Sequence, residues 1–172
     1  ASSQNLAPTA SNLQVTPAIP TVLTGLTLIY TYDDTEGDSE SGTSIEWFRD
    51  GVSAPEVADS LTVSGSFLSR GETWSVTVTP SDGTNQGTPQ NLGSIIISNA
   101  APTADPAVII PSSPSQSDNL SVQYTFDDAD LDSESGTIIS WHLDGVHIPE
   151  LDNSSTVSRL YTRTGDLWTA SV

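Results

Sequence analysis

The sequence predicts an all-β protein made of two tandem β-sandwich domains. The first observation is an internal repeat, because the acidic run at residues 33–42 returns at residues 127–136 and the same offset of 94 residues aligns the surrounding sequence without a gap. The second is an alternation of apolar and polar residues, rich in β-branched and aromatic types, that indicates strands. The third is the frequent Gly, Pro, Asn and Asp between these runs, which predicts turns.

Three segments of the first repeat are predicted strands, namely residues 26–32, 44–49 and 74–79. The second of them is followed by Asp50-Gly51, a pair typical of tight hairpin turns. The apolar run at residues 95–97 is expected to be the last strand of this repeat. Tryptophans on such strands recur in both repeats, so core packing is a better interpretation than sugar stacking; they are Trp47, Trp74, Trp141 and Trp168.

The repeat defines the expected domain boundaries. Residues 1–6 form an N-terminal tail, residues 7–99 the first repeat and residues 100–172 the second. Val172 corresponds to Val78 in the middle of a strand, so the second repeat lacks the counterpart of residues 79–99, including its final strand. We expect either further sequence after residue 172, which is the simpler alternative, or a strand supplied by another chain.

Composition excludes several classes of function. The net charge is −18, with four Lys plus Arg against 22 Asp plus Glu, so electrostatic binding to nucleic acid or to an anionic membrane is excluded. The chain has no cysteine, which excludes disulfides and thiolate metal sites. No apolar stretch reaches the roughly 18 residues of a membrane span. Abundant Ser, Thr, Asp and Gly, with little Lys and Glu, favour an extracellular or cell-surface location.

Two segments carry a family resemblance. Residues 68–83 resemble the E–F segment of fibronectin type III domains, and residues 45–51 are similar to the strand of immunoglobulin-like domains that bears the core tryptophan. With Ala-Pro-Thr-Ala at residues 7–10 and an acidic loop between strands, the chain resembles tandem immunoglobulin-like repeats of large prokaryotic surface proteins. This resemblance implies adhesion, surface layers, filaments or spacing. The lack of a core disulfide argues against antibody-like recognition.

Five carboxylates lie within eight residues of each acidic run. Close like charges repel each other, and a hard cation such as Ca²⁺ relieves that repulsion while accepting several oxygen ligands in irregular geometry. A further aspartate, Asp82, can join if its loop lies at the same end of the sandwich. The candidate ligands are Asp33, Asp34, Glu36, Asp38, Glu40, Asp82, Asp127, Asp128, Asp130, Asp132 and Glu134.

Two alternatives compete with a Ca²⁺ site in these runs. One is a solvated acidic loop that supplies solubility. The other, catalysis by paired carboxylates, requires two acids in distinct environments within a cleft, which an exposed loop does not provide. Two N-x-S/T sequons, at Asn119 and Asn153, are possible glycosylation sites.

These observations favour a non-enzymatic structural module of an extracellular surface filament, adhesin or surface layer, stabilised by Ca²⁺. One alternative is a spacer or carbohydrate-binding region of a secreted enzyme. Another is a filament subunit assembled by β-strand complementation. The expected partners are other copies of the chain or further repeats, with surface glycans or other cell-surface proteins as additional possibilities; nucleic acid and membrane insertion are not expected.

Overall fold

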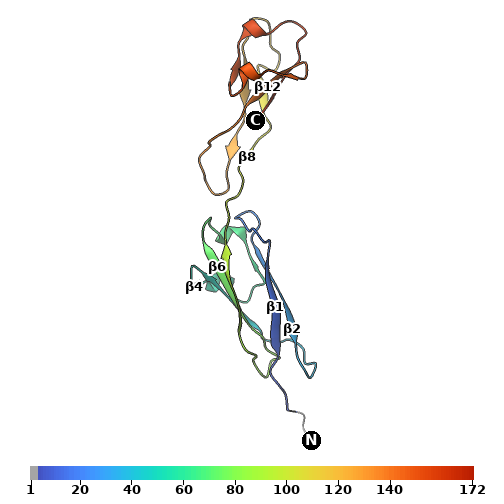
Figure 1. The fold of residues 1–172 in the computed structure, drawn as a ribbon, viewed down its shortest axis with the longest axis vertical. Coiled ribbons are helices and arrows are strands. Elements are labelled where there is room, and N and C mark those ends of the chain that lie inside the picture. The colour runs from blue at the N-terminus through green and yellow to red at the C-terminus, as the bar shows by residue number, and fades with distance from the viewer. Residues whose placement is uncertain (1–3) are drawn as a thin grey trace. The chain divides into compact units, whose positions relative to one another are not determined.

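The computed structural model describes residues 4–172, which form strands, turns and short 3-10 segments but no α-helix. Among these residues there is no helix with the length and apolar character of a membrane span. All pairings between the strands are antiparallel, so the fold is all-β. Contacts divide the chain into two compact units, one ending at Ala100 and the other beginning at Ala101 (Figure 1).

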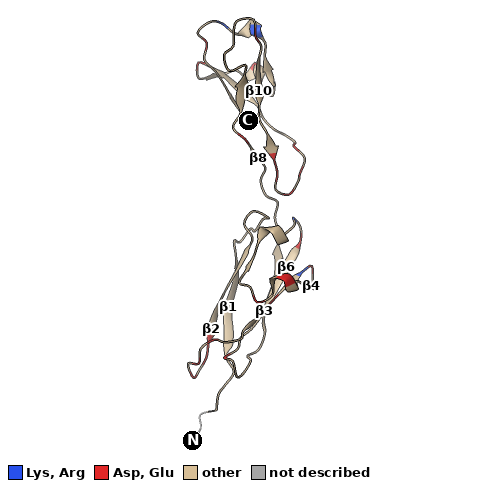
Figure 2. Cartoon of the chain, turned by 180° about the vertical axis from the view of Figure 1, so that it is seen from behind, with Lys and Arg blue, Asp and Glu red and all other residues tan. Residues whose placement is uncertain are grey.

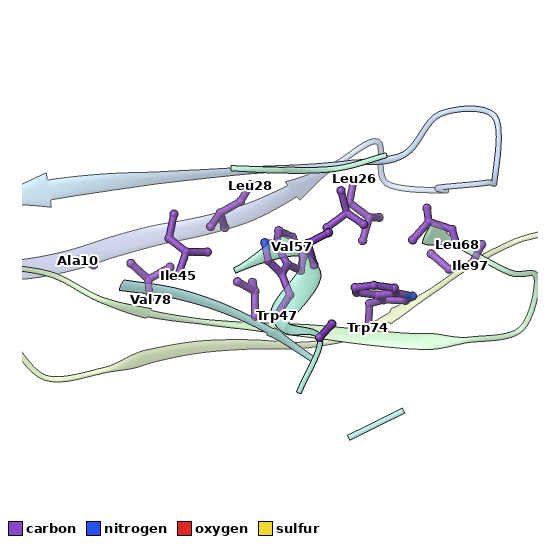
Figure 3. Close-up of a cluster of buried hydrophobic side chains, with 13 residues drawn as sticks. Ala10, Leu26, Leu28, Ile45, Trp47, Val57, Leu68, Trp74, Val78 and Ile97 are labelled. Atoms are coloured by element: carbon purple, nitrogen blue, oxygen red, sulfur yellow. The ribbon is translucent and has the colours of Figure 1, made fainter. Parts of the chain in front are cut away.

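The first unit contains two sheets. One has the order β1 (Thr9–Thr16), β2 (Leu26–Asp33), β5 (Thr62–Val63). The other has the order β4 (Val52–Ser53), β3 (Ser44–Arg49), β6 (Thr73–Thr79), β7 (Gln90–Ile96). Apolar side chains from both sheets point into one core between them, as Figure 3 shows, an arrangement consistent with a β-sandwich.

Alternating side chains build this core. In β6, Trp74, Val76 and Val78 are buried and the residues between them are only partly so, as the period of a half-buried strand requires. Trp47 of β3 packs edge-on against Trp74, with ring centroids 6.4 Å apart and an interplanar angle of 68°. The Trp47 indole donates to the Ser60 carbonyl at 2.9 Å, so its one polar group is satisfied inside the core.

The predicted strands and hairpin of this unit are found. The segment at residues 44–49 is strand β3, and Asp50-Gly51 turns it into β4 with φ of 50° and 78°. Two successive positive φ values are the requirement of a type I′ hairpin turn. The last strand differs from the prediction, because β7 begins at Gln90 and contains an irregularity at Ser94, where φ is 63°. Ile97, just after β7, is buried in the core.

The second unit repeats this arrangement with shorter strands. Its sheets have the orders β14–β10–β9, β11–β8 and β13–β12–β15. The strands are β8 (Thr103–Ala104), β9 (Val108–Ile110), β10 (Leu120–Gln123), β11 (Phe126–Asp127), β12 (Ser140–Leu143), β13 (Val146–His147), β14 (Thr156–Val157) and β15 (Trp168–Ser171). At the repeat offset, β8 and β9 together match β1, and β10 and β11 together match β2.

All four tryptophans pack in the two hydrophobic cores, as the sequence predicts. Trp47, Trp74 and Trp141 have no exposed surface. Trp168 packs edge-on against Trp141 at 6.3 Å and lies, partly buried, against the core of the second unit. In the first unit the core around Trp74 also includes Ile97.

Candidate metal centre

The acidic loop of the first unit is curled around its first carboxylate. Asp34 follows β2, and its Oδ1 accepts hydrogen bonds from the backbone amides of Glu36 at 2.9 Å and Asp38 at 3.1 Å. The Gly37 amide donates to the Asp34 carbonyl at 3.1 Å. The side chain of one aspartate therefore accepts the hydrogen bonds of two backbone amides in the loop, as Asp side chains commonly do in turns. Its other oxygen, Oδ2, remains available.

The second unit folds its loop in the same way. Asp128 Oδ1 accepts from the amides of Asp130 at 2.9 Å and Asp132 at 3.0 Å, and the Leu131 amide donates to the Asp128 carbonyl. Leu131 replaces Gly37 and keeps a positive φ of 64°, which a leucine rarely adopts. The local hydrogen bonds of the aspartate thus hold this loop even without a glycine at its tip.

Asp82 reaches the acidic loop from the turn after β6. The two segments are joined by the Ser41 amide, which donates to the Ser81 carbonyl at 2.8 Å. Asp82 Oδ1 accepts from the amides of Thr84 and Asn85, both at 2.6 Å. These bonds to the charged form, the Asn85 bond foremost, lower the pKa of Asp82. Asp82 is therefore held ionised and fixed in position.

Three carboxylates converge at this point. Asp34, Asp38 and Asp82 each place one oxygen so that all three lie within 4.8 Å of one another. Two oxygens that bind one Ca²⁺ at about 2.4 Å can be at most about 4.8 Å apart, so this spacing fits a shared ion. Within residues 4–172 this is the one group of three or more such ligands. Asp34 and Asp82 are partly buried, and Asp38 is exposed.

Buried oxygens without a partner surround the cluster. Asp34 Oδ2, Asn5 Oδ1 and the Tyr32 hydroxyl are shielded from solvent and make no hydrogen bond. Tyr32 lies in the field of these acids: burial is the main cause of its raised pKa, and Asp34 and Asp82 add to it. Buried polar atoms nearly always have a partner in proteins, whether protein, water or ion. Oxygen donors of this kind are those that a hard cation binds.

The segment before β1 takes part in the site, although residues 1–6 were expected to be a tail. Asn5 Nδ2 donates to Asp82 Oδ2 at 3.0 Å, and Asn85 Nδ2 donates to the Asn5 carbonyl at 3.0 Å. The Leu6 amide donates to Glu36 Oε2 at 3.2 Å. Residues 1–3 of the expected tail lie outside the described residues. Asn5 recurs as Asn99 at the repeat offset, which is the sequence signal that could have identified it.

The other predicted ligands of the first unit lie outside the cluster. Asp33 is the last residue of β2 and is exposed. Glu36 binds the Leu6 amide, and Glu40 Oε1 accepts from the Tyr30 hydroxyl at 2.6 Å. Burial, followed by this contact with Glu40, raises the pKa of Tyr30 to about 12. Glu36 and Glu40 therefore tie the loop to its surroundings.

In the second unit the predicted ligands are spread along the loop. Asp127 is exposed at the end of β11, and Asp128 is buried. Asp130 and Asp132 are partly buried beside Asp128 and donate their amides to it. Glu134 Oε1 accepts from the hydroxyls of Tyr124 and Thr137, both at 2.6 Å, and these bonds lower its pKa. At the repeat offset, the counterpart of Asp82 would follow Val172.

The arginines of the first unit are engaged elsewhere. Figure 2 shows acidic residues along the loop after β2 and no basic residue beside them. Arg49 pairs with Glu56 at 2.9 Å and lies over the Trp74 ring at 5.0 Å, while Arg70 donates to Asn99. The repulsion among the clustered carboxylates is therefore not neutralised by a side-chain cation of the first unit's described residues.

Both sequon asparagines are exposed, and both use their side-chain oxygen within the fold. Asn119 Oδ1 accepts from the Arg159 amide at 2.8 Å. Asn153, with φ of 60°, accepts from the Ile139 amide at 3.2 Å, as Asp59 does from Ile45 in the first unit. These side chains hold turns, so the sequons have a structural explanation independent of glycosylation.

Comparison of the chain with protein-family models, with curated proteins and with solved structures gives no match in any of the three. Function is therefore inferred from the residues and their geometry.

Proposed function

We propose that this chain is a non-enzymatic structural module of an extracellular surface protein, and that Ca²⁺ stabilises its first unit. The supporting observation is the convergence of Asp34, Asp38 and Asp82 from two loops, beside the buried and partnerless Oδ2 of Asp34. A cation held there would join the loop after β2 to the turn after β6. The first unit would then resist opening at this end.

The ligand chemistry favours Ca²⁺ over other metals. Asp34, Asp38 and Asp82 supply carboxylate oxygens, and Asn5 Oδ1 is a neutral oxygen donor beside them. The cluster contains no histidine and the chain has no cysteine, which disfavours zinc. Mg²⁺ requires near-ideal octahedral geometry, whereas Ca²⁺ accepts the irregular positions that two joined loops offer.

Several observations favour a structural role over catalysis. A general acid needs a raised pKa, whereas hydrogen bonds lower the pKa of Asp82 and of Glu134. Three of the four tryptophans are fully buried and cannot stack on a sugar; Phe67 and Tyr161 are the exposed aromatic residues of the described chain. This distribution supports a structural module over a carbohydrate-binding region.

The setting we propose is a surface filament, adhesin or surface layer with tandem immunoglobulin-like repeats. It is supported by the internal repeat, the lysine-free acidic composition and the resemblance of residues 45–51 and 68–83 to such domains. A module of this kind acts by folding stably and spacing its neighbours, and its partners are further repeats or copies of the same chain.

Calorimetric titration of the 172-residue chain with CaCl₂ tests the proposal directly. We expect one binding event that chelator reverses and that MgCl₂ reproduces only weakly. Thermal unfolding should shift upward with Ca²⁺, because a ligand that binds only the folded state stabilises it. Absence of binding heat together with identical melting curves in Ca²⁺ and chelator would remove the cation from the proposal.

A further inference from the structure

Two histidines face each other on the hairpin that β12 and β13 form in the second unit. His142 of β12 lies directly opposite His147 of β13. The turn between the two strands is Asp144-Gly145, with φ of 50° and 82°, as a two-residue type I′ turn requires. The chain contains two histidines in all, so both of its imidazoles are on this hairpin.

The backbone of the hairpin brings the two imidazoles close together. The neighbouring pair is hydrogen-bonded, because the Ile148 amide donates to the Trp141 carbonyl at 2.9 Å. Hydrogen-bonded and non-hydrogen-bonded pairs alternate along an antiparallel ladder, so His142 and His147 form a non-hydrogen-bonded pair, in which side chains lie closest. Trp141 points into the core, so the adjacent His142 lies on the solvent face of the sheet, where His147 is exposed.

The spacing of the two rings fits the binding of one metal ion by both. The centroids of the His142 and His147 rings are 5.3 Å apart, with an interplanar angle of 39°. Zinc–nitrogen bonds of about 2.0–2.1 Å place an imidazole centre about 3.2 Å from the ion, so two rings at a tetrahedral angle lie about 5.2 Å apart. Imidazole nitrogen is a ligand that Zn²⁺, Cu²⁺ and Ni²⁺ prefer. The hairpin therefore already holds the two rings at the separation that such an ion requires.

A carboxylate orients one of the two rings. His147 Nε2 lies 2.7 Å from Asp152 Oδ1. An ionised carboxylate only accepts hydrogen bonds, so Nε2 carries the proton, and a neutral ring then keeps the lone pair of Nδ1 for an ion. Histidines that bind metals commonly donate their second nitrogen to a carboxylate in this way, which fixes the ring. The Asp152 amide donates to the Pro149 carbonyl at 3.2 Å, so the backbone of the aspartate is itself held in place.

The first unit builds the same hairpin without these groups. At the repeat offset, the three positions carry neither an imidazole nor a carboxylate, and they are Phe48, Ser53 and Ala58. Phe48 of β3 lies opposite Ser53 of β4, so the register of the hairpin is unchanged. The hairpin therefore forms without either histidine and without the aspartate. All three groups differ together between the two units, as the parts of one site would.

We propose that the second unit binds one divalent transition-metal ion of the zinc class through ring nitrogens of His142 and His147, and that Asp152 positions His147 for it. Two protein ligands leave the other positions of a tetrahedral ion to water or to a further ligand. The net charge of −18 attracts cations to the chain. A bound ion would join β12 to β13 on the solvent face of the sheet.

This site is independent of the acidic centre in the first unit. The two share no residue, and their ligands differ, since the acidic centre offers oxygen atoms and the hairpin offers imidazole nitrogen. Ca²⁺ takes oxygen ligands and does not compete for the two histidines, whereas Zn²⁺ prefers nitrogen. Either site can therefore be tested while the other is occupied or removed.

Titration of the 172-residue chain with ZnCl₂, in an excess of CaCl₂, tests this proposal. Proton NMR follows the imidazole signals, which come from His142 and His147 alone because the chain has no other histidine. We expect both rings to shift together, to saturate at one Zn²⁺ per chain and to return when chelator is added. Rings that do not shift at millimolar ZnCl₂, or that shift at different zinc concentrations, would overturn the proposal.

His142→Phe and His147→Ser are the matched variants, because the first unit forms its hairpin with those residue types. Each should weaken zinc binding about tenfold or more, since the remaining ring loses its chelating partner. Asp152→Ala should weaken it about tenfold while both rings still shift together, as loss of an orienting carboxylate does. Amide hydrogen exchange of β12 in chelator, equal in all three variants, shows that the hairpin is intact. Zinc affinity that is unchanged in either histidine variant overturns the proposal.

Discussion

A carboxylate oxygen of Asp34 and one of Asp82 lie within 4.8 Å of each other, although Asp34 follows strand β2 and Asp82 follows strand β6. The two side chains are fixed by different hydrogen bonds. Asp34 is held by the amides of its own loop, and Asp82 by the amides of Thr84 and Asn85. The backbone amides of two separate loops therefore hold the two carboxylates close together.

Removing the charges of the cluster should abolish the effect of Ca²⁺. For the unaltered chain we expect Ca²⁺ at about one hundred times its Kd to raise the melting temperature of the first unit by about 10 °C or more. The double variant Asp34→Asn, Asp38→Asn should lose this shift and remain folded at low temperature. Differential scanning calorimetry with and without chelator measures both.

Asp33→Asn is the control for that experiment, since it removes an adjacent charge that lies outside the cluster. It should keep the Ca²⁺ shift. Equal loss in the control and in the double variant would mean that Ca²⁺ acts through the net charge of the loop, and the site would not be specific.

Asp82 should make stability depend on pH in the acid range. Its folded-state pKa lies below its ordinary value of 3.8 because backbone amides bind the charged form. The contribution is therefore present above pH 3.8 and lost as pH falls through the lower folded-state pKa. In chelator, from about pH 5 to about pH 2, Asp82→Asn should lose less stability than the unaltered chain in urea unfolding. If stability falls equally with pH in the variant and in the unaltered chain, Asp82 does not have the lowered pKa.

Tyr30 should ionise at a higher pH than an ordinary tyrosine. Burial and Glu40 hold its pKa at about 12, so the neutral phenol is favoured in the folded state. That stability is present below the ordinary value of 10.0 and lost as pH rises through about 12. Glu40→Gln should lower the Tyr30 pKa, by removing a negative charge beside it, without restoring the ordinary value, because burial is the larger cause. Ultraviolet titration of tyrosinate, with Tyr30→Phe to identify the signal, measures the change.

The two equivalent tryptophans should differ in their effect on stability. Trp74→Ala removes a fully buried ring and should destabilise the first unit by about 3–5 kcal/mol. Trp168→Ala removes a half-buried ring beside an existing hollow and should cost about half as much. Denaturant unfolding followed by hydrogen exchange resolves the two units. Equal losses would show that the hollow beside Trp168 is closed in solution.

The tips of the two acidic loops should respond in opposite directions. Gly37→Ala places a side chain at φ of 83° and should destabilise the first unit by about 1 kcal/mol. Leu131→Gly relieves a leucine at φ of 64°, and since Leu131 is 90% exposed no burial is lost. Its gain should be smaller, about 0.5 kcal/mol, because glycine also increases the entropy of the unfolded chain. A loss of stability in Leu131→Gly would contradict this account.

The strands with strong alternation could be predicted from the sequence, as β3 and the Asp50-Gly51 turn demonstrate. Strand β1 was not predicted. Its polar residues face solvent at a sheet edge, and its register shifts between Ser11 and Gln14, with Asn12 at φ of 54°. This segment forms a strand because it pairs with β2, and the local sequence periodicity does not reveal such long-range pairing.

The sequence predicted which acidic residues are candidate ligands, but it did not predict which of them lie close together. Asp34 and Asp38 converge because the hydrogen bonds of Asp34 curl the chain. Asp33 still belongs to β2, and Glu40 accepts from the Tyr30 hydroxyl instead. Asn5 was overlooked because a polar segment before the first strand has no pattern that predicts a docked conformation. Long-range contacts of this kind depend on the whole fold.

The tip of the loop that Asp34 shapes is open to solvent. A side chain added at Gly37 would meet no atom within 4 Å, and Leu131 at the same place is almost wholly exposed. A single exposed side chain, such as a fluorophore attachment point, could therefore be placed at either tip while the amides that Asp34 and Asp128 bind stay in place. The repeat thus offers two equivalent positions for labelling.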